Sequence, residues 1–224
     1  MSALSQLAKQ LLDDSDLWSR TGMKVAKKED GSPVSSVDLA LNTFVCGFLN
    51  RIWPELWIVS EESPSSLSMP NTRRVAVVDP LDGTENFVSG LPIWGVSVAI
   101  CQDGIHEGSM LAFPELGLSL ATGDRAPQYA SRIIGHPSSS PLASLVHRET
   151  GPENRIMGSA AFNLFCVATG RFASFSNQTG AYTWDILAGL NLALERGCRV
   201  IVNDREYRGE LLDASQKYCF EVFR

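Results

Sequence analysis

The stretch Val75-Ala76-Val77-Val78-Asp79-Pro80-Leu81-Asp82-Gly83-Thr84 is the most informative part of this sequence. It begins with an apolar run that predicts a buried strand, and the run leads into two carboxylates three positions apart. The proline between them restricts the backbone, so both acidic side chains can converge on one point. Gly83 permits close backbone approach, and the N–H groups of Gly83 and Thr84 are placed as at a helix start, where anions bind. The loop is therefore predicted to hold a metal ion and a phosphate, although an ordinary Asp-Gly turn has the same composition.

Further acidic residues stand at positions where a rigid site can form. Glu61 follows the short apolar stretch Ile58-Val59, Asp185 opens a helical stretch after Trp184, and Asp38 opens another. Taken alone, Glu61 is a solvated loop residue, whereas Asp38 and Asp185 are helix caps. Their joint occurrence favours a different interpretation, because a hard divalent cation takes carboxylate oxygens from several chain segments. The acidic side chains together predict a metal centre.

Composition and charge restrict the classes of function. The chain has 224 residues, 44% of them hydrophobic, which suits one large domain or two tightly joined halves. The formal net charge of -6 comes without any block of Lys and Arg, so nucleic acid is not expected as a partner. The five cysteines form no CxxC pair, and no apolar run is long enough for a signal peptide or a membrane span. We therefore expect reduced thiols and a soluble, cytoplasmic protein.

The hydrophobic periodicity predicts helices and strands without an internal repeat or a clean linker. Helices are expected at 3–12, 37–53, 142–148, 160–169 and 184–196, the last of them ending at Gly197. Strands are expected at 56–59, 75–78, 94–101, 105–113, 118–122, 172–176, 200–202 and 218–222. The strands between 75 and 122 are expected to form an antiparallel meander, 24–33 a loop or short hairpin, and 63–72 a mobile loop. Helices packed on sheets in layers then give one α/β unit with two sheets.

In their order along the chain, these motifs resemble the inositol monophosphatase family of magnesium-dependent, lithium-sensitive phosphatases, and the similarity covers most of the chain. The matching blocks are Ser32-Pro33-Val34 with Asp38, Ser60-Glu61-Glu62-Ser63, Asp79 to Thr84 with Asn86-Phe87, Gly158 to Asn163, and Trp184 to Gly189 with Glu195-Arg196-Gly197. The resemblance implies a layered αβαβα sandwich in an α/β fold, usually as a homodimer. Residues 1–224 are then a single domain, with a metal-binding α+β half at about 1–125 and an α/β half at about 126–224.

The resemblance also implies a role for each site residue. Two or three Mg²⁺ ions are expected on the side chains of Glu61, Asp79, Asp82 and Asp185 and on the backbone carbonyl of Leu81, with Asp79 bridging a pair. Thr84, oriented by Asp38 and with Glu61 nearby, is expected to help position and deprotonate the attacking water. The phosphate is expected against the N–H groups of Gly83 and Thr84, and the alcohol part of the substrate beside Gly158, Ser159 and Ala160. The implied activity is that of a phosphoric monoester hydrolase acting on a small soluble phosphate ester.

The identity of that ester stays open. Inositol-selective members of the family carry an acidic residue shortly before the Trp-Asp block, where this chain has Asn177-Gln178-Thr179. An amide accepts hydrogen bonds from sugar hydroxyls less strongly than a carboxylate does. Besides an inositol phosphate or a sugar phosphate, the alternatives are 3'-phosphoadenosine 5'-phosphate and histidinol phosphate.

Two further alternatives concern the mechanism and the class of protein. An aspartyl-phosphate mechanism has the signature Asp-x-Asp-Gly-Thr, but Pro80 and Leu81 separate the two acids here, and the extra residue re-aims the first carboxylate. A non-catalytic, metal-binding regulatory relative is the alternative of another class. The segment 122–155, which is short for the family, motivates that alternative.

Overall fold

The computed structural model describes residues 2–28, 31, 33–63, 73–140 and 151–224. The helices are α1 (Ala3–Asp13), η1 (Ser15–Trp18), α2 (Ser36–Ile52), α3 (Thr84–Val88), η3 (Pro114–Leu116), α4 (Ala160–Ala168) and α5 (Thr183–Glu195). The strands are β1 (Val25–Lys27), β2 (Pro33–Ser35), β3 (Trp57–Ser60), β4 (Arg74–Asp82), β5 (Gly95–Gln102), β6 (Ile105–Phe113), β7 (Leu118–Ala121), β8 (Ile133–His136), β9 (Glu153–Ile156), β10 (Ser174–Tyr182), β11 (Arg199–Val202), β12 (Arg205–Glu206) and β13 (Lys217–Phe223).

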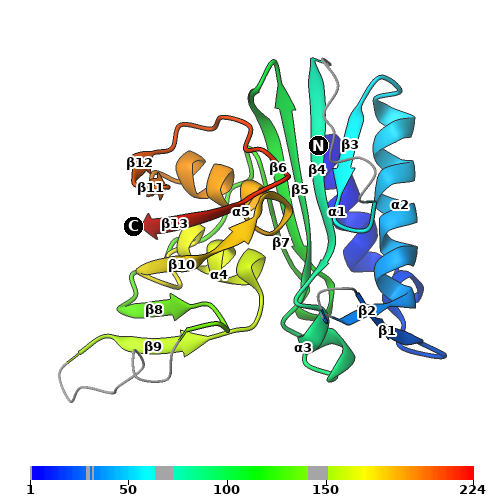
Figure 1. Cartoon of the computed structure of the whole chain (residues 1–224), viewed down its shortest axis with the longest axis horizontal. Coiled ribbons are helices and arrows are strands. Elements are labelled where there is room, and N and C mark those ends of the chain that lie inside the picture. The colour runs from blue at the N-terminus through cyan, green and yellow to red at the C-terminus, as the bar shows by residue number, and fades with distance from the viewer. Residues whose placement is uncertain (1, 29–30, 32, 64–72, 141–150) are drawn as a thin grey trace.

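The elements pack in layers (Figure 1). Helices α1 and α2 cover one face of a five-stranded sheet of order β3-β4-β5-β6-β7. Helices α4 and α5 lie between the other face and a six-stranded sheet of order β12-β11-β13-β10-β8-β9. Strands β1 and β2 pair antiparallel as a separate hairpin. The expected layered α/β fold is confirmed, with the order helices, sheet, helices, sheet across the described residues.

Strand β4 explains why a continuous apolar run forms the centre of the five-stranded sheet. Val75 and Val77 belong to the core shared with α4 and α5, whereas Ala76 and Val78 belong to the core shared with α1 and α2. Side chains of a strand alternate between the two faces of a sheet, so a strand covered on both faces is apolar throughout. The antiparallel pairing of β4 with β5, β5 with β6 and β6 with β7 confirms the predicted meander.

The end of β4 positions the acidic residues. The pairing register with β5 shifts between Asp79 and Asp82, so Pro80 and Leu81 lie in a bulge. A bulge tolerates proline because it does not need every ladder N–H. Strand β3 runs parallel to β4, and the Glu61 N–H donates to the Val78 carbonyl at 3.2 Å. Glu61 therefore leaves its strand directly beside Asp79.

The structure extends or corrects several expected boundaries. Strand β10 continues to Tyr182 instead of ending at Ser176, because pairing with β13 carries the chain through the polar Asn177-Gln178-Thr179 segment by way of a bulge. Strands β8 and β9 and helix α3 were not predicted. The helix expected at 142–148 and the loop expected at 63–72, apart from Ser63, lie outside the described residues. Within the described ranges, no helix is both long and apolar enough to cross a membrane.

Candidate active site

Three carboxylates from distant parts of the chain meet at the end of the five-stranded sheet. Glu61 follows β3, Asp79 lies in β4, and Asp185 lies in the first turn of α5. One oxygen atom from each lies within 4.8 Å of the other two. Oxygen ligands from separate rigid elements are the arrangement that a hard divalent cation needs.

Each aspartate of the site uses one oxygen to accept hydrogen bonds from the surrounding protein. The Leu81 N–H donates to Asp79 Oδ1 at 2.9 Å, and the Tyr182 N–H donates to Asp185 Oδ2 at 3.0 Å. Asp82 Oδ2 accepts the Ser159 hydroxyl and the Ala161 N–H. The second oxygen of Asp79 is buried and has no hydrogen-bond partner within the described part of the chain. A buried acceptor left in this state is costly unless a ligand completes it.

The electrostatics of the cluster fit a cation. Burial raises the pKa of Asp79 well above its usual range, and the charges of Glu61 and Asp82 raise it further. Burial likewise raises the pKa of Asp185, where Asp82 and Glu61 add to the effect and Lys217 opposes it. Burial raises the pKa of Asp82 to about 6, although its hydrogen bonds from Ser159 and Ala161 oppose the rise. Divalent cations would remove this unfavourable concentration of negative charge.

Lys28, which directly follows β1, neutralises part of the cluster. Its ammonium lies 2.6 Å from Glu61 Oε1 and 2.7 Å from Glu62 Oε1. Burial alone lowers the pKa of Lys28, but the two glutamates outweigh this and raise it above its usual range. Lys28 thus supplies a positive charge at Glu61, where we expect a metal ion.

A Lys28→Met variant is expected to bind Mg²⁺ about 5-fold more tightly than the wild type, because the ammonium no longer competes for Glu61. Titration calorimetry of the metal-free proteins measures the change. Lys27→Met is the matched control, since Lys27 is exposed and forms no ion pair among the described residues. Weaker Mg²⁺ binding by Lys28→Met would instead mean that Lys28 supports the metal site.

Asp38 and Thr84 form a second polar pair beside the carboxylates. Asp38 is buried, and its Oδ2 accepts the Ser35 N–H at 2.8 Å as part of a capping box at the start of α2. Its Oδ1 accepts the Thr84 hydroxyl at 3.1 Å, a donor that also lies 3.1 Å from the Leu81 carbonyl. Asp38 therefore both caps helix α2 and orients Thr84. The two roles that the sequence suggested for it, helix cap and site residue, are compatible.

Close backbone contacts join the Asp79–Thr84 turn to the Gly158 loop. Gly83 has φ +90°, and a Cβ there would lie 3.2 Å from Ser159 Cβ. A Cβ on Gly158, at φ +77°, would lie 2.7 Å from the Asn86 side-chain amide. That amide donates from Nδ2 to the carbonyls of Ile93 and Met157, at 2.7 and 2.8 Å. Glycine is thus required at both positions to bring the two loops together.

A cavity of about 310 Å³ opens beside Asp82 and Asp185. Gly158, Ser159 and Ala160 line one side of it, and residues of β10 and the start of β13 line another. The predicted substrate-side residues therefore lie beside two of the predicted metal ligands. The amide of Thr84, the first residue of α3, is among those that helix geometry leaves without an intrahelical partner.

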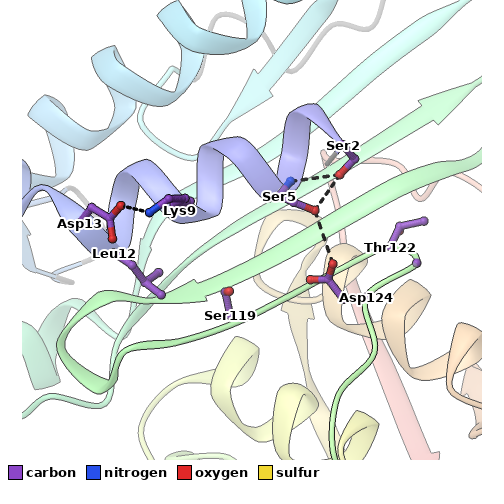
Figure 2. Close-up of a pocket in the computed structure, with 9 residues that line it drawn as sticks. Ser2, Ser5, Lys9, Leu12, Asp13, Ser119, Thr122 and Asp124 are labelled. Carbon is purple, nitrogen blue, oxygen red and sulfur yellow. Dashed lines mark hydrogen bonds and ion pairs between the residues drawn. The ribbon is translucent and has the colours of Figure 1, made fainter.

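A larger groove lies elsewhere, between α1 and the end of β7 (Figure 2). Its polar side chains pair with one another: Ser2 with Ser5, Ser5 with Asp124, and Lys9 with Asp13. Because these groups already have partners, they form no set of free converging ligands among the described residues that line the groove. The cavity at Asp82 and Asp185 is the candidate active site.

Comparison with known proteins identifies the family of this chain. Residues 3–128 match the profile of the inositol monophosphatase family. The chain belongs to the inositol monophosphatase family. It is 30% identical over 216 residues to an inositol-1-monophosphatase of Mesorhizobium japonicum, covering 85% of this chain and 79% of that protein. The enzymes of this family are phosphoric monoester hydrolases that depend on metal ions.

Other members of the inositol monophosphatase family extend the comparison. The chain is 25% identical over 223 residues to the 3'(2'),5'-bisphosphate nucleotidase CysQ of Salmonella typhimurium, covering 88% of this chain and 86% of that protein. It also shares the fold of an IMPase/NADP phosphatase crystallised with Mg²⁺ and phosphate, with a TM-score of 0.78 and 19% identity over 98% of this chain and 88% of that one.

The structure brings together the residues that the family resemblance selected. Glu61, Asp79 and Asp185 form the cluster, Asp82 and the Gly158–Ala160 loop line the adjacent cavity, and Leu81 and Asp38 hold Thr84. Sequence reasoning missed Lys28, Asn86 as the link between loops, and Lys217 in the cavity wall. Asn86 belongs to one of the matching blocks, but its contacts with Ile93 and Met157 carry no sequence signal. Lys28 and Lys217 lie outside every block that carries the resemblance.

Proposed function

We propose that this protein is a magnesium-dependent phosphomonoesterase for a small soluble phosphate ester of the sugar phosphate or inositol phosphate class. The observation that carries the proposal is the buried, unpartnered oxygen of Asp79 within a carboxylate cluster that adjoins the cavity. Family membership supports phosphatase chemistry, and the buried carboxylates supply the ligands that it requires.

The chain's own residues divide the work of metal binding. Glu61, Asp79 and Asp185 would hold one ion, and Asp82 with the Leu81 carbonyl would complete two or three sites. Bound Mg²⁺ ions would activate water and stabilise the charge of the phosphoryl group and of the departing alkoxide. Because phosphoryl transfer mainly needs positioning and charge stabilisation, no Ser, Cys or His nucleophile is required.

Thr84 and Asp38 hold a proton next to the cluster. With its hydrogen directed to Asp38 Oδ1, the Thr84 oxygen is free to accept a hydrogen bond from the attacking water. Asp38 is fixed by Ser35 and cannot turn away without losing its bonds to that residue. The pair therefore orients the water for attack and gives its proton a route to Asp38, with Glu61 nearby.

Substrate contacts follow from the loops. The phosphate would lie against the N–H groups of Gly83 and Thr84, and the alcohol part would lie along Gly158, Ser159 and Ala160 in the cavity. The short gap between Gly83 and Ser159 keeps phosphate and alcohol subsites adjacent. The family resemblance further supports a cytoplasmic homodimer, and sedimentation of the purified protein tests the oligomeric state.

A phosphate-release assay tests the proposal. The purified protein is supplied with Mg²⁺ and, separately, with inositol phosphates, sugar phosphates, phosphorylated nucleotides and histidinol phosphate. We expect turnover of at least one ester, and its loss on chelation and recovery on adding Mg²⁺. Tight Mg²⁺ binding without turnover of any ester would contradict the proposal and favour a metal-binding regulatory protein.

A bisphosphorylated nucleotide is the second candidate substrate. The similarity to CysQ over most of both chains favours it. Comparing adenosine 3',5'-bisphosphate with the sugar phosphates in the same assay separates the two classes.

A further inference from the structure

The candidate active-site cavity has an asymmetric charge. Asp82 and Asp185 lie at the proposed metal end, and Lys217 is the one cation among its described lining residues. The other described lining residues are neutral. A cavity whose alcohol side carries a positive charge and no carboxylate attracts a negatively charged ligand group.

The backbone fixes the position of Lys217. Lys217 begins β13 and is paired across the sheet with Tyr182, which directly precedes α5 and its Asp185. Gly180 has φ +82° at the bulge of β10, and a Cβ there would lie 3.1 Å from the Lys217 Cβ. The first part of the lysine side chain therefore has a defined place at the rim of the cavity.

The head of Lys217 is available for a ligand. Its Nζ lies 4.8 Å from the centre of the Tyr182 ring, which stacks on Trp184 at 4.7 Å. No carboxylate forms an ion pair with it within the described ranges, and its residue is exposed. The aromatic contact orients the ammonium without neutralising its charge.

The amide oxygen of Asn177, which lines the same cavity as Lys217, already has hydrogen-bond donors. Asn177 Oδ1 already accepts the N–H and the hydroxyl of Thr179, at 3.0 and 2.8 Å. Gln178, in the segment that replaces the family's acidic position, donates to Glu221 at 2.8 Å. Asn177 Oδ1 is therefore not free for a sugar hydroxyl, whereas the Lys217 ammonium keeps its donors.

We propose that Lys217 binds a second anionic group on the alcohol part of the substrate. The substrate class is then a phosphate monoester that also carries another phosphate or a carboxylate. This inference rests on the proposed phosphatase function and narrows it. Lys217 is a specificity residue that touches the substrate away from the reacting phosphorus.

Matched pairs of esters test the inference. They also distinguish a second phosphate from a carboxylate as the group that Lys217 binds. Adenosine 3'-monophosphate is compared with adenosine 3',5'-bisphosphate for a second phosphate, and glycerol 2-phosphate with 2-phosphoglycerate for a carboxylate. In at least one pair, we expect the wild type to prefer the ester that carries a second anionic group on its alcohol part. In Lys217→Met, kcat/KM for that member should fall about 5-fold, mainly through KM, as befits one exposed charge contact. For the partner ester that lacks the second anionic group, kcat/KM should change less than about 2-fold.

Further variants exclude a merely structural effect. Lys217→Arg should restore the preference because it keeps the positive charge, and Lys217→Glu should reverse it because it places a carboxylate at the same position. Lys9→Met is the matched control, because Lys9 pairs with Asp13 beside the other groove. Equal loss on both members of a pair, or no loss, overturns the role of Lys217 while the phosphatase function stands. No turnover of any ester by the wild type would instead overturn the proposed function itself.

Discussion

Asp82→Asn is expected to lower turnover about 1000-fold, corresponding to about 4 kcal/mol of transition-state stabilisation. Asparagine keeps one side-chain oxygen, which still accepts the Ser159 hydroxyl and the Ala161 N–H. The other oxygen becomes an amide nitrogen, which cannot bind a cation. The variant should therefore retain its fold while one metal position is weakened. Measurements of kcat/KM against Mg²⁺ concentration, together with thermal unfolding, check both parts.

Asp204→Asn is the matched control for this change. Asp204 is exposed in the turn between β11 and β12 at φ +62°, a conformation that asparagine tolerates. The control should keep wild-type turnover and stability. Full activity of Asp82→Asn would show that Asp82 does not bind a catalytic ion.

Asp79→Asn is expected to have opposite effects on stability and activity. Turnover should fall by about 1000-fold or more, because Asp79 is the buried centre of the carboxylate cluster. The metal-free protein should become more stable at neutral pH, since the substitution removes a buried charge whose pKa is raised by burial and by Glu61 and Asp82. The gain is about 1.4 kcal/mol for each unit by which that pKa is raised. Chemical unfolding in the presence of a chelator measures it.

The pH dependence identifies the cause of that gain. Folding raises the Asp79 pKa, so the folded wild type binds more protons than the unfolded chain between the ordinary value of 3.8 and the raised value. Its stability then falls as pH rises through this window, whereas Asp79→Asn lacks this contribution. The difference between the two proteins should be largest above the window and vanish near pH 3.8. A less stable variant at neutral pH would indicate that Asp79 is already neutralised in the metal-free protein.

The sequence predicted the meander and the Asp79–Thr84 turn because both depend on local patterns. The β4 run is apolar on both faces of the sheet, as expected for a strand that is covered on both sides. The turn contains Pro80 and Gly83, two residue types that are characteristic of turns because of their backbone conformations. Strands β8 and β9 were missed, since they are short and β9 carries the polar Glu153-Asn154-Arg155. Strand β8 pairs parallel with β10, and β9 pairs parallel with β8. These tertiary contacts leave no periodic signal in the sequence.

The acidic residues of the candidate site could be predicted from the sequence, but the two lysines that lie near them could not. Asp38 and Asp185 seemed to require a choice between helix cap and site residue, yet each uses a separate oxygen for the local bond. Lys28 approaches Glu61 from a polar hairpin, across 33 residues, and such an ion pair leaves no periodic signal. Lys217 reaches the cavity only because the last strand returns beside Tyr182.

The two hydrogen bonds donated by the Asn86 side chain restrict how substrate preference can change during the evolution of this enzyme. One amide nitrogen holds both Ile93 and Met157, so movement of the Gly158 loop would also disturb the Asp79–Thr84 turn. New substrate preferences are therefore more readily acquired by exchanging side chains on the opposite wall, at Asn177 and Lys217, than by remodelling that loop. Natural variation in ligand choice should accumulate on the two strands, while Asn86 and Gly158 stay unchanged.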